Sequence, residues 1–219
     1  LLKRNYINQN ERMGFINYFK LSKNSFYKIR IDQAVGLIPT HLDVVVIGYF
    51  SNYYSAGIYR IAKKLVDPIN YLIVAFSPWM LNKISTNNSY DFADLVKRIL
   101  IPASLLIFGF YYLFGAELVE LIVGDEFTKS YTPMLILVIG YLSYFLTFWT
   151  RHYLFLNNLI RKHTIGRLIN LSVFLIGSTF LITLFSFNGI ALAVTAGTIV
   201  QKLYEYYIYF VNKYSRINS

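Results

Sequence analysis

The chain has 219 residues, of which 56% are hydrophobic, 18% aromatic and only 15% charged. A soluble domain of this length cannot bury so many apolar side chains, and uncharged runs recur at residues 99–116, 130–150 and 168–201. The composition therefore excludes an ordinary soluble domain and predicts an all-α integral membrane protein. The net charge of +10 would suit a nucleic-acid partner in a soluble chain, but membrane topology explains its placement along this sequence better.

Residues 1–30 carry seven basic side chains and one acid, interleaved with aromatic and aliphatic side chains. This mixture is typical of an amphipathic helix on an anionic membrane surface. Basic segments with aromatic residues also bind RNA, but the adjoining apolar segment favours the membrane. We therefore expect an interfacial, cytoplasmic linker in residues 1–30 and no nucleic-acid partner.

Two apolar arms follow at residues 31–50 and 53–81, joined by a short uncharged turn. They carry charges at the depth of a bilayer core, where each charge costs roughly 2.5–3.5 kcal/mol on insertion scales. Such residues usually line a water-filled path or a binding site. In the first arm the charge is Asp43, and in the second arm the charges are Arg60, Lys63, Lys64 and Asp67.

The spacing of these residues groups them on helix faces. At about 100° per residue, the four charges of the second arm share one face about 100° wide. The first arm has one narrow face of the same kind, made by Asp32, Gly36, Pro39 and Asp43. We expect the two faces to meet, and either a pair between Asp43 and the basic patch or a titrating Asp43 fits this pattern.

Four further spans are predicted at residues 99–115, 131–150, 164–185 and 190–211, followed by a cytoplasmic tail at residues 212–219. With residues 1–30 inside, the inner segments together with Arg167, in the basic flank at the start of the fifth span, hold 16 of the 21 Lys and Arg residues, and the outer loops hold one. The positive-inside rule thus predicts six spans with both termini in the cytoplasm. Lys202 and Glu205, inside the last span, have the spacing of a helical ion pair.

Residues 48–69, GYFSNYYSAGIYRIAKKLVDPI, resemble Wzx-type polysaccharide and oligosaccharide flippases of the multidrug/oligosaccharidyl-lipid/polysaccharide exporter superfamily. The features that carry the resemblance are Asp43, the apolar run after it, and Gly57-Ile58-Tyr59 before the basic residues. The acidic segment at residues 124–127 is a second similarity. The resemblance implies one six-helix bundle, the C-terminal half, of a transporter with about twelve helices. We therefore expect a further bundle upstream of the first residue.

The resemblance also implies a ligand. In a bacterial inner membrane it would be a polyprenyl-pyrophosphate-linked oligosaccharide, such as an O-antigen or capsule repeat unit, translocated by alternating access. Arg60, Lys63 and Lys64 would bind its pyrophosphate, because Arg and Lys both suit phosphate oxygens. Asp43 and Asp67 would be polar cavity residues with a coupling role. Snorkelling of the bases to outer headgroups is the alternative.

The sequence shows no catalytic constellation. No cysteine is present, the three histidines are scattered, and no nucleophile and base pair, acidic metal cluster or Gly-rich phosphate loop stands out. We expect a transporter rather than an enzyme, without cofactor or metal. Its partners would be the lipid-linked substrate, membrane lipids, polysaccharide polymerase and glycosyltransferases. The alternative functions are a cation-coupled multidrug-type exporter and a non-transport membrane subunit of polysaccharide assembly.

Overall fold

A computed structural model describes residues 15–86 and 89–217, with side chains placed for residues 27–84 and 97–212. The described residues form helices and no strand, which confirms the all-α prediction. In chain order the elements are α2 (Phe15–Phe50), α3 (Tyr53–Thr86), α4 (Ser89–Val123), the 3₁₀ helix η1 (Asp125–Ser130), α5 (Tyr131–Leu156), α6 (Ile160–Phe185) and α7 (Phe187–Ile217).

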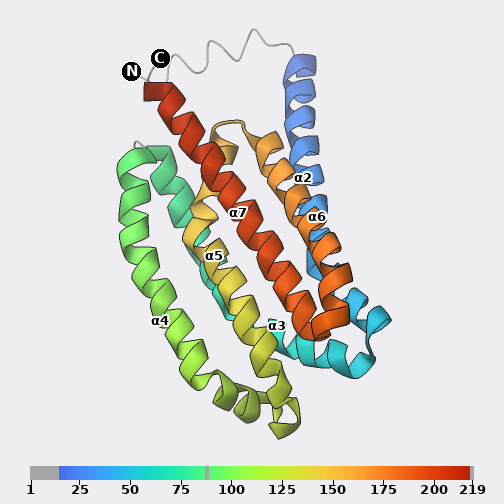
Figure 1. Cartoon of the computed structure of the whole chain (residues 1–219). Coiled ribbons are helices and arrows are strands. Elements are labelled where there is room, and N and C mark those ends of the chain that lie inside the picture. Colours follow the sequence, from blue (N-terminus) through green and yellow to red (C-terminus); the bar gives the residue numbers. More distant parts are fainter. Residues whose placement is uncertain (1–14, 87–88, 218–219) are drawn as a thin grey trace.

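The long helices run up and down the molecule (Figure 1). Helix α7 packs along α6 on one side and α5 on the other, while α3 packs on α5 and α2 on α6. Helix α4 lies at the outer edge beside α5. Helix α3 first crosses the lower end of the molecule and then rises behind α5. Pro68 accounts for this bend, because proline lacks the N–H that would bond to the carbonyl of Lys64.

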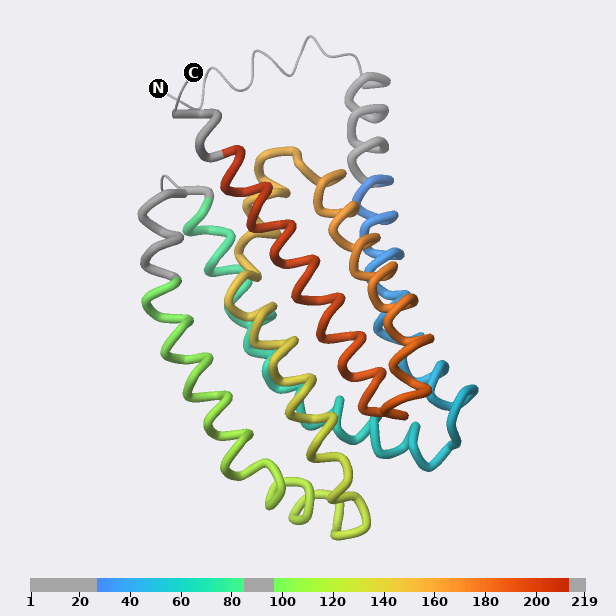
Figure 2. Tube along the Cα trace, viewed as in Figure 1, coloured from blue at the N-terminus to red at the C-terminus, as the bar shows by residue number. Residues whose placement is uncertain are grey.

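Three connections meet at the lower end of the molecule (Figure 2). The Ser51 hydroxyl, between α2 and α3, lies 3.3 Å from the hydroxyl of Ser186, between α6 and α7. The Tyr54 hydroxyl donates to the carbonyl of Glu126 in η1 over 3.3 Å. The turn between α5 and α6 lies at the opposite end, so successive helices run in opposite directions.

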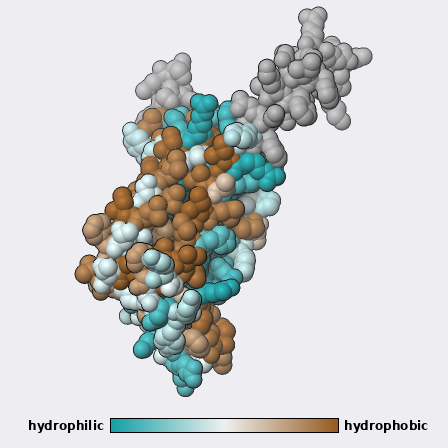
Figure 3. Space-filling view, turned by 90° about the vertical axis from the view of Figure 1, so that its right-hand side faces the viewer, coloured by the Kyte–Doolittle hydropathy of each residue, from teal (hydrophilic) through white to brown (hydrophobic). Residues whose placement is uncertain are grey.

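Four helical segments are long and apolar enough to cross a membrane: Tyr27–Phe50, Lys97–Val123, Asp125–Leu156 and Ile160–Phe185. Among the described residues, α3 and α7 contain no segment that meets the same criterion. Many large hydrophobic side chains are exposed, and the side view in Figure 3 shows a broad hydrophobic area at the centre of that face, with hydrophilic residues along its right edge. On α4, Leu105, Leu113 and Leu121 are exposed. Such a surface suits contact with lipid and supports a membrane protein.

The apolar core lies between α3, α5, α6 and α7. Its largest fully buried side chains include Tyr59, Phe148, Phe174, Met80 and Met134. Helix α5 has buried residues along its length, from Pro133 to Leu154, and it contacts α3, α4, α6 and α7. It therefore lies at the centre of the bundle.

Each of the six predicted spans falls within one helix, but most of the helices are longer than the spans. Helix α2 begins at Phe15, so no helix end coincides with the predicted linker boundary at residue 30. Residues 1–14 of that linker, residues 87–88 and the last two residues of the tail lie outside the described residues. Hydropathy marks only the apolar part of a helix, and a helix continues through polar flanks until the backbone turns.

Backbone conformation marks three of these ends. Gly124 has a φ of 104°, and its N–H bonds back to the carbonyl of Glu120 over 2.9 Å, which closes α4. Asn158, with φ 57°, follows α5, and Ser186, with φ 52°, follows α6. Asn is one of the few residues that tolerate this left-handed region.

The arrangement of the connections predicts a labelling pattern. Ser51→Cys and Glu126→Cys should react with a membrane-impermeant thiol reagent from the same side of the membrane, because both sites lie at the lower end of the bundle. Asn158→Cys should react only from the opposite side. The chain has no cysteine to remove, so each single variant reports one site in intact and permeabilised cells. Labelling of positions 51 and 158 from the same side would contradict the arrangement.

Candidate functional site

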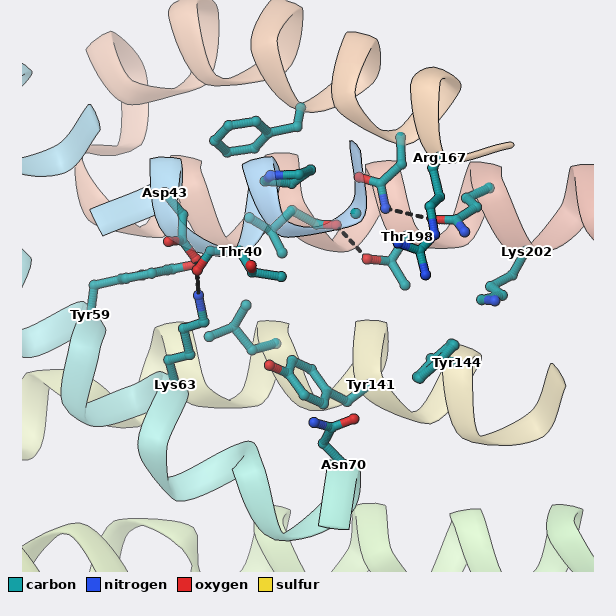
Figure 4. Close-up of a pocket in the computed structure, with 17 residues that line it drawn as sticks. Thr40, Asp43, Tyr59, Lys63, Asn70, Tyr141, Tyr144, Arg167, Thr198 and Lys202 are labelled. Carbon is teal, nitrogen blue, oxygen red and sulfur yellow. Dashed lines mark hydrogen bonds and ion pairs between the residues drawn. The ribbon is translucent and has the colours of Figure 1, made fainter. Parts of the chain in front are cut away.

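A cavity of about 280 Å³ lies between five of the helices: α2, α3, α5, α6 and α7. Among the described residues that line it, three are basic and one is acidic. Figure 4 shows two polar ends, with Asp43, Tyr59 and Lys63 at one and Arg167, Lys202 and Tyr144 at the other. The polar side chains of the lining are Thr40, Asp43, Tyr59, Lys63, Asn70, Tyr141, Tyr144, Arg167, Asn170, Thr198, Gln201 and Lys202.

The first end is an ion pair between α2 and α3. The Lys63 Nζ lies 2.5 Å from Oδ2 of Asp43, which is only 1% exposed. The Tyr59 hydroxyl donates to the same oxygen over 3.0 Å. Of the two alternatives that the sequence leaves open for Asp43, the structure shows the pair across the hairpin.

The local backbone of α2 supports this pair. Oδ1 of Asp43 accepts a hydrogen bond from the N–H of Val44 over 2.8 Å. The carbonyl of Thr40, the usual helical acceptor for that N–H, accepts from Lys63 Nζ over 2.7 Å. Pro39, one residue earlier, has no N–H to donate to the preceding turn. Lys63 is therefore held by one carboxylate and one carbonyl from the same turn of α2.

The second end begins with Arg167 on α6. Its Nη1 donates to the backbone carbonyl of Asp32 over 2.7 Å, and its Nη2 lies 3.5 Å from Oδ2 of the same residue. The guanidinium lies directly over Gly36, where an added Cβ would be 1.6 Å from Nη1. Only a residue without a side chain leaves room for this contact, so Gly36 permits Arg167 to reach α2.

Lys202 on α7 is the other base at this end. Its Nζ donates to Oε2 of Glu205 over 2.7 Å and lies 4.3 Å from the centre of the Tyr144 ring. Glu205 is fully buried and also accepts hydrogen bonds from Gln201, over 2.7 Å, and from Thr150, over 3.0 Å. The pairing that the i, i+3 spacing predicted is thus present, and it lies inside the bundle.

His163 lies between the two buried acids Asp32 and Glu205. Its Nδ1 lies 2.7 Å from Oδ1 of Asp32, and its Nε2 lies 3.5 Å from Oε1 of Glu205. The ring is 1% exposed. We call Asp32, His163, Arg167, Lys202 and Glu205 the buried ion network. It connects α2, α6 and α7, and its two bases face the cavity.

The structure separates the predicted site residues into two groups. Asp43 and Lys63 line the cavity. Arg60 is exposed on α3, and Lys64 pairs with Asp67 over 3.0 Å while its side chain remains 68% exposed. The shared face predicted for α2 holds, since Gly36, Pro39 and Asp43 all line the cavity.

Sequence reasoning assigned no site role to the buried ion network. In the sequence, Arg167 stands in the basic flank at the start of the fifth predicted span, and His163 is one of three scattered histidines. Only the shared face of Asp32 with Asp43, and the spacing of Lys202 with Glu205, pointed toward it. No three-ligand group that could hold a metal ion occurs among the described residues.

The fit of Arg167 over Gly36 predicts opposite responses of two glycines in one helix. Gly36→Ala should lower the thermal unfolding temperature, because the new methyl group displaces Arg167 from the buried Asp32. Gly48→Ala is the matched control, since no atom lies within 4 Å of its added Cβ. It should leave stability unchanged or raise it by about 0.5–1 kcal/mol. Equal unfolding temperatures for both variants in detergent would contradict this role of Gly36.

Comparison with known proteins does not assign this site. No protein-family model matches the chain, and neither a curated protein nor a solved structure does. We therefore infer the function from the residues that line the cavity.

Proposed function

We propose that this chain is a bundle of a membrane exporter that translocates a polyprenyl-pyrophosphate-linked oligosaccharide by alternating access. The observation that carries the proposal is the cavity: three bases and one acid face it from the inside of a bundle with an apolar surface. Buried or membrane-embedded cations are costly and are retained where they meet an anion or a water-filled path. A diphosphate is the anion that a lipid carrier brings into a membrane.

The three bases suit a diphosphate in different ways. Arg167 can present two parallel N–H groups to phosphate oxygens, whereas Lys63 and Lys202 supply compact positive charge. Each base already has an acidic neighbour: Asp43 for Lys63, Asp32 for Arg167 and Glu205 for Lys202. A phosphate group therefore competes with these acids, which limits affinity and permits release on the far side.

The neutral part of the lining suits sugar hydroxyls. Asn70, Asn170 and Thr198 offer donors and acceptors, and Tyr141 and Tyr144 offer aromatic faces with a hydroxyl at the tip. A volume of about 280 Å³ is near the lower end of the roughly 300–1,000 Å³ usual for ligand pockets. It accommodates a diphosphate and an adjoining sugar, so a longer oligosaccharide requires a more open conformation of the same bundle.

The proposal includes a topology. All six long helices cross a bacterial inner membrane, with α3 and α7 crossing as cavity walls and both termini in the cytoplasm. The lower end of the bundle, with Ser51 and Glu126, then faces outward. The exposed Arg60 and the pair of Lys64 with Asp67 lie on a face of α3 that requires water or another protein wall, as in transporters built from two repeats.

A cation-coupled multidrug-type exporter is the second candidate. Its cationic substrates require acids in the cavity, and the lining has one acid against three bases. This excess of bases favours the anionic substrate.

Two matched double variants test the assignment. Asp43→Asn with Lys63→Gln neutralises the pair that lines the cavity, and Lys64→Gln with Asp67→Asn neutralises the exposed pair on the same helix. Removing both partners avoids leaving an unpaired charge, so both proteins should fold. We expect the first to lower surface polysaccharide about tenfold or more, the loss that one charged hydrogen bond explains. The second should retain export.

The readouts are surface polysaccharide in the native host and protein abundance in the membrane. Arg167→Lys should also reduce export, because lysine keeps the charge but loses the paired N–H groups. Arg161→Lys, at an exposed position of the same helix, is its control. Normal export from both cavity variants at normal abundance would contradict the proposal. Loss only in the Lys64 and Asp67 variant would favour the exposed face as the binding site.

A further inference from the structure

His163 lies between two buried carboxylates at unequal distances. The Nδ1 to Oδ1 distance to Asp32 is a hydrogen bond at 2.7 Å, whereas the Nε2 to Oε1 distance to Glu205 is 3.5 Å. Asp32 also accepts from the hydroxyl of Thr164 over 3.1 Å. An ionised carboxylate only accepts hydrogen bonds, so the short contact with Asp32 favours the tautomer of His163 that carries its proton on Nδ1. Its Nε2 then faces Glu205 without a proton.

The charges of the buried ion network balance without a proton on that nitrogen. Arg167 compensates Asp32, and Lys202 compensates Glu205. A neutral His163 leaves the group with no net charge, which a low-dielectric interior favours. The balance depends on two bases that also face the cavity. Each base can pair with its buried acid or with a ligand.

A ligand anion changes this balance. When it draws Lys202 toward the cavity, Glu205 stays buried on α7 with hydrogen bonds from Gln201 and Thr150 but without its cation. A buried unpaired carboxylate is costly. The nearest group that can replace the lost charge is His163, whose Nε2 is 3.5 Å away. Protonation of Nε2 converts this contact into an ion pair.

We propose that the cavity binds an anion and a proton together, with the proton added to Nε2 of His163. This inference rests on the proposed function, because the anion is the diphosphate of the lipid-linked substrate. The proton comes from solvent, the N–H bond forms on Nε2, and the imidazolium takes the place of Lys202 beside Glu205. Anion binding and proton uptake at this site are then thermodynamically coupled, so each raises the affinity for the other.

Charged residues surround His163 on its own helix and on the helices that pack against it. Helix α2 supplies Asp32, and α6 itself supplies Arg167. Helix α7 supplies Lys202 and Glu205. From α5, the ring of Phe155 packs 5.4 Å from the ring of His163, and the guanidinium of Arg151 lies 5.4 Å from the centre of the Phe155 ring. His152, on the same helix, is the other imidazole described near the network.

Titration calorimetry on the purified full chain tests the coupling. The probe is a short-chain isoprenyl pyrophosphoryl sugar, whose diester phosphates do not titrate near neutral pH. Measuring its binding heat in buffers with different ionisation enthalpies gives the number of protons exchanged. We expect uptake of about 0.5–1 proton per probe near pH 7.5, and binding that weakens as pH rises, by up to about tenfold per pH unit.

Variants locate the proton. His163→Asn should abolish proton uptake, whereas His41→Asn, at an exposed position outside the cavity lining, should leave it unchanged. His152→Asn should also retain it. If His163→Asn does not fold, labelling histidine with ¹⁵N in the wild-type chain gives the same information, because the chain has only three histidines. The probe should convert one ring from a single N–H to the doubly protonated form.

The outcomes separate the inference from the proposed function. Probe binding without proton exchange, or uptake that survives in His163→Asn, would overturn the inference and leave the diphosphate cavity standing. Uptake lost only in His152→Asn would overturn it in favour of the neighbouring ring. Failure of the wild-type chain to bind the probe would overturn both.

Discussion

The constraint on which this structure depends is the neutralisation of charge inside an apolar bundle. Asp32, Asp43 and Glu205 are at most 1% exposed, and a carboxylate in such a place is stable only when cations and hydrogen bonds surround it. Each of these acids has a basic partner on a neighbouring helix or one turn away. The pairs of Asp43 with Lys63 and of Asp32 with Arg167 therefore constrain how α2 lies against α3 and α6.

The pairs also explain why the cavity is polar and the outer surface is not. Asp43 with Lys63 ties α2 to α3, and the buried ion network ties α2, α6 and α7 together. The bases of these pairs extend into the space between the helices, whereas α4 carries exposed leucines on its outer face. The same three bases, Lys63, Arg167 and Lys202, thus neutralise buried acids and line the cavity. In the proposed exporter, a ligand that competes for Lys63 or Arg167 would perturb contacts between helices, as alternating access requires, whereas Lys202 pairs with Glu205 within α7.

Much of this arrangement follows from the sequence in physical terms. Uncharged runs and turn residues located the six long helices, and helical periodicity placed Gly36, Pro39 and Asp43 on one face. Periodicity also grouped Lys63 with Arg60 and Lys64, although only Lys63 lines the cavity. A face about 100° wide is broader than the part of α3 that faces α2, and the bend at Pro68 cannot be derived from spacing alone.

The buried ion network was beyond the reach of sequence reasoning for a different reason. Its members come from residues 32, 163–167 and 202–205, and no local pattern encodes which helices become neighbours. The charge count groups Arg167 with the basic flank at the start of a span, whereas the absence of a side chain at Gly36 lets it reach the backbone of α2. Which of these residues meet depends on which helices pack against one another, and periodicity does not specify that.

The central claim is that the cavity recognises the diphosphate of a lipid-linked sugar. The most direct measurement compares two ligands by native mass spectrometry of the purified chain: an isoprenyl pyrophosphoryl sugar, and an isoprenyl glycoside with the same chain and sugar but no phosphate. The account predicts that the pyrophosphate form binds at least about tenfold more tightly, a difference of about 1.4 kcal/mol. Equal affinity for the two ligands would contradict it.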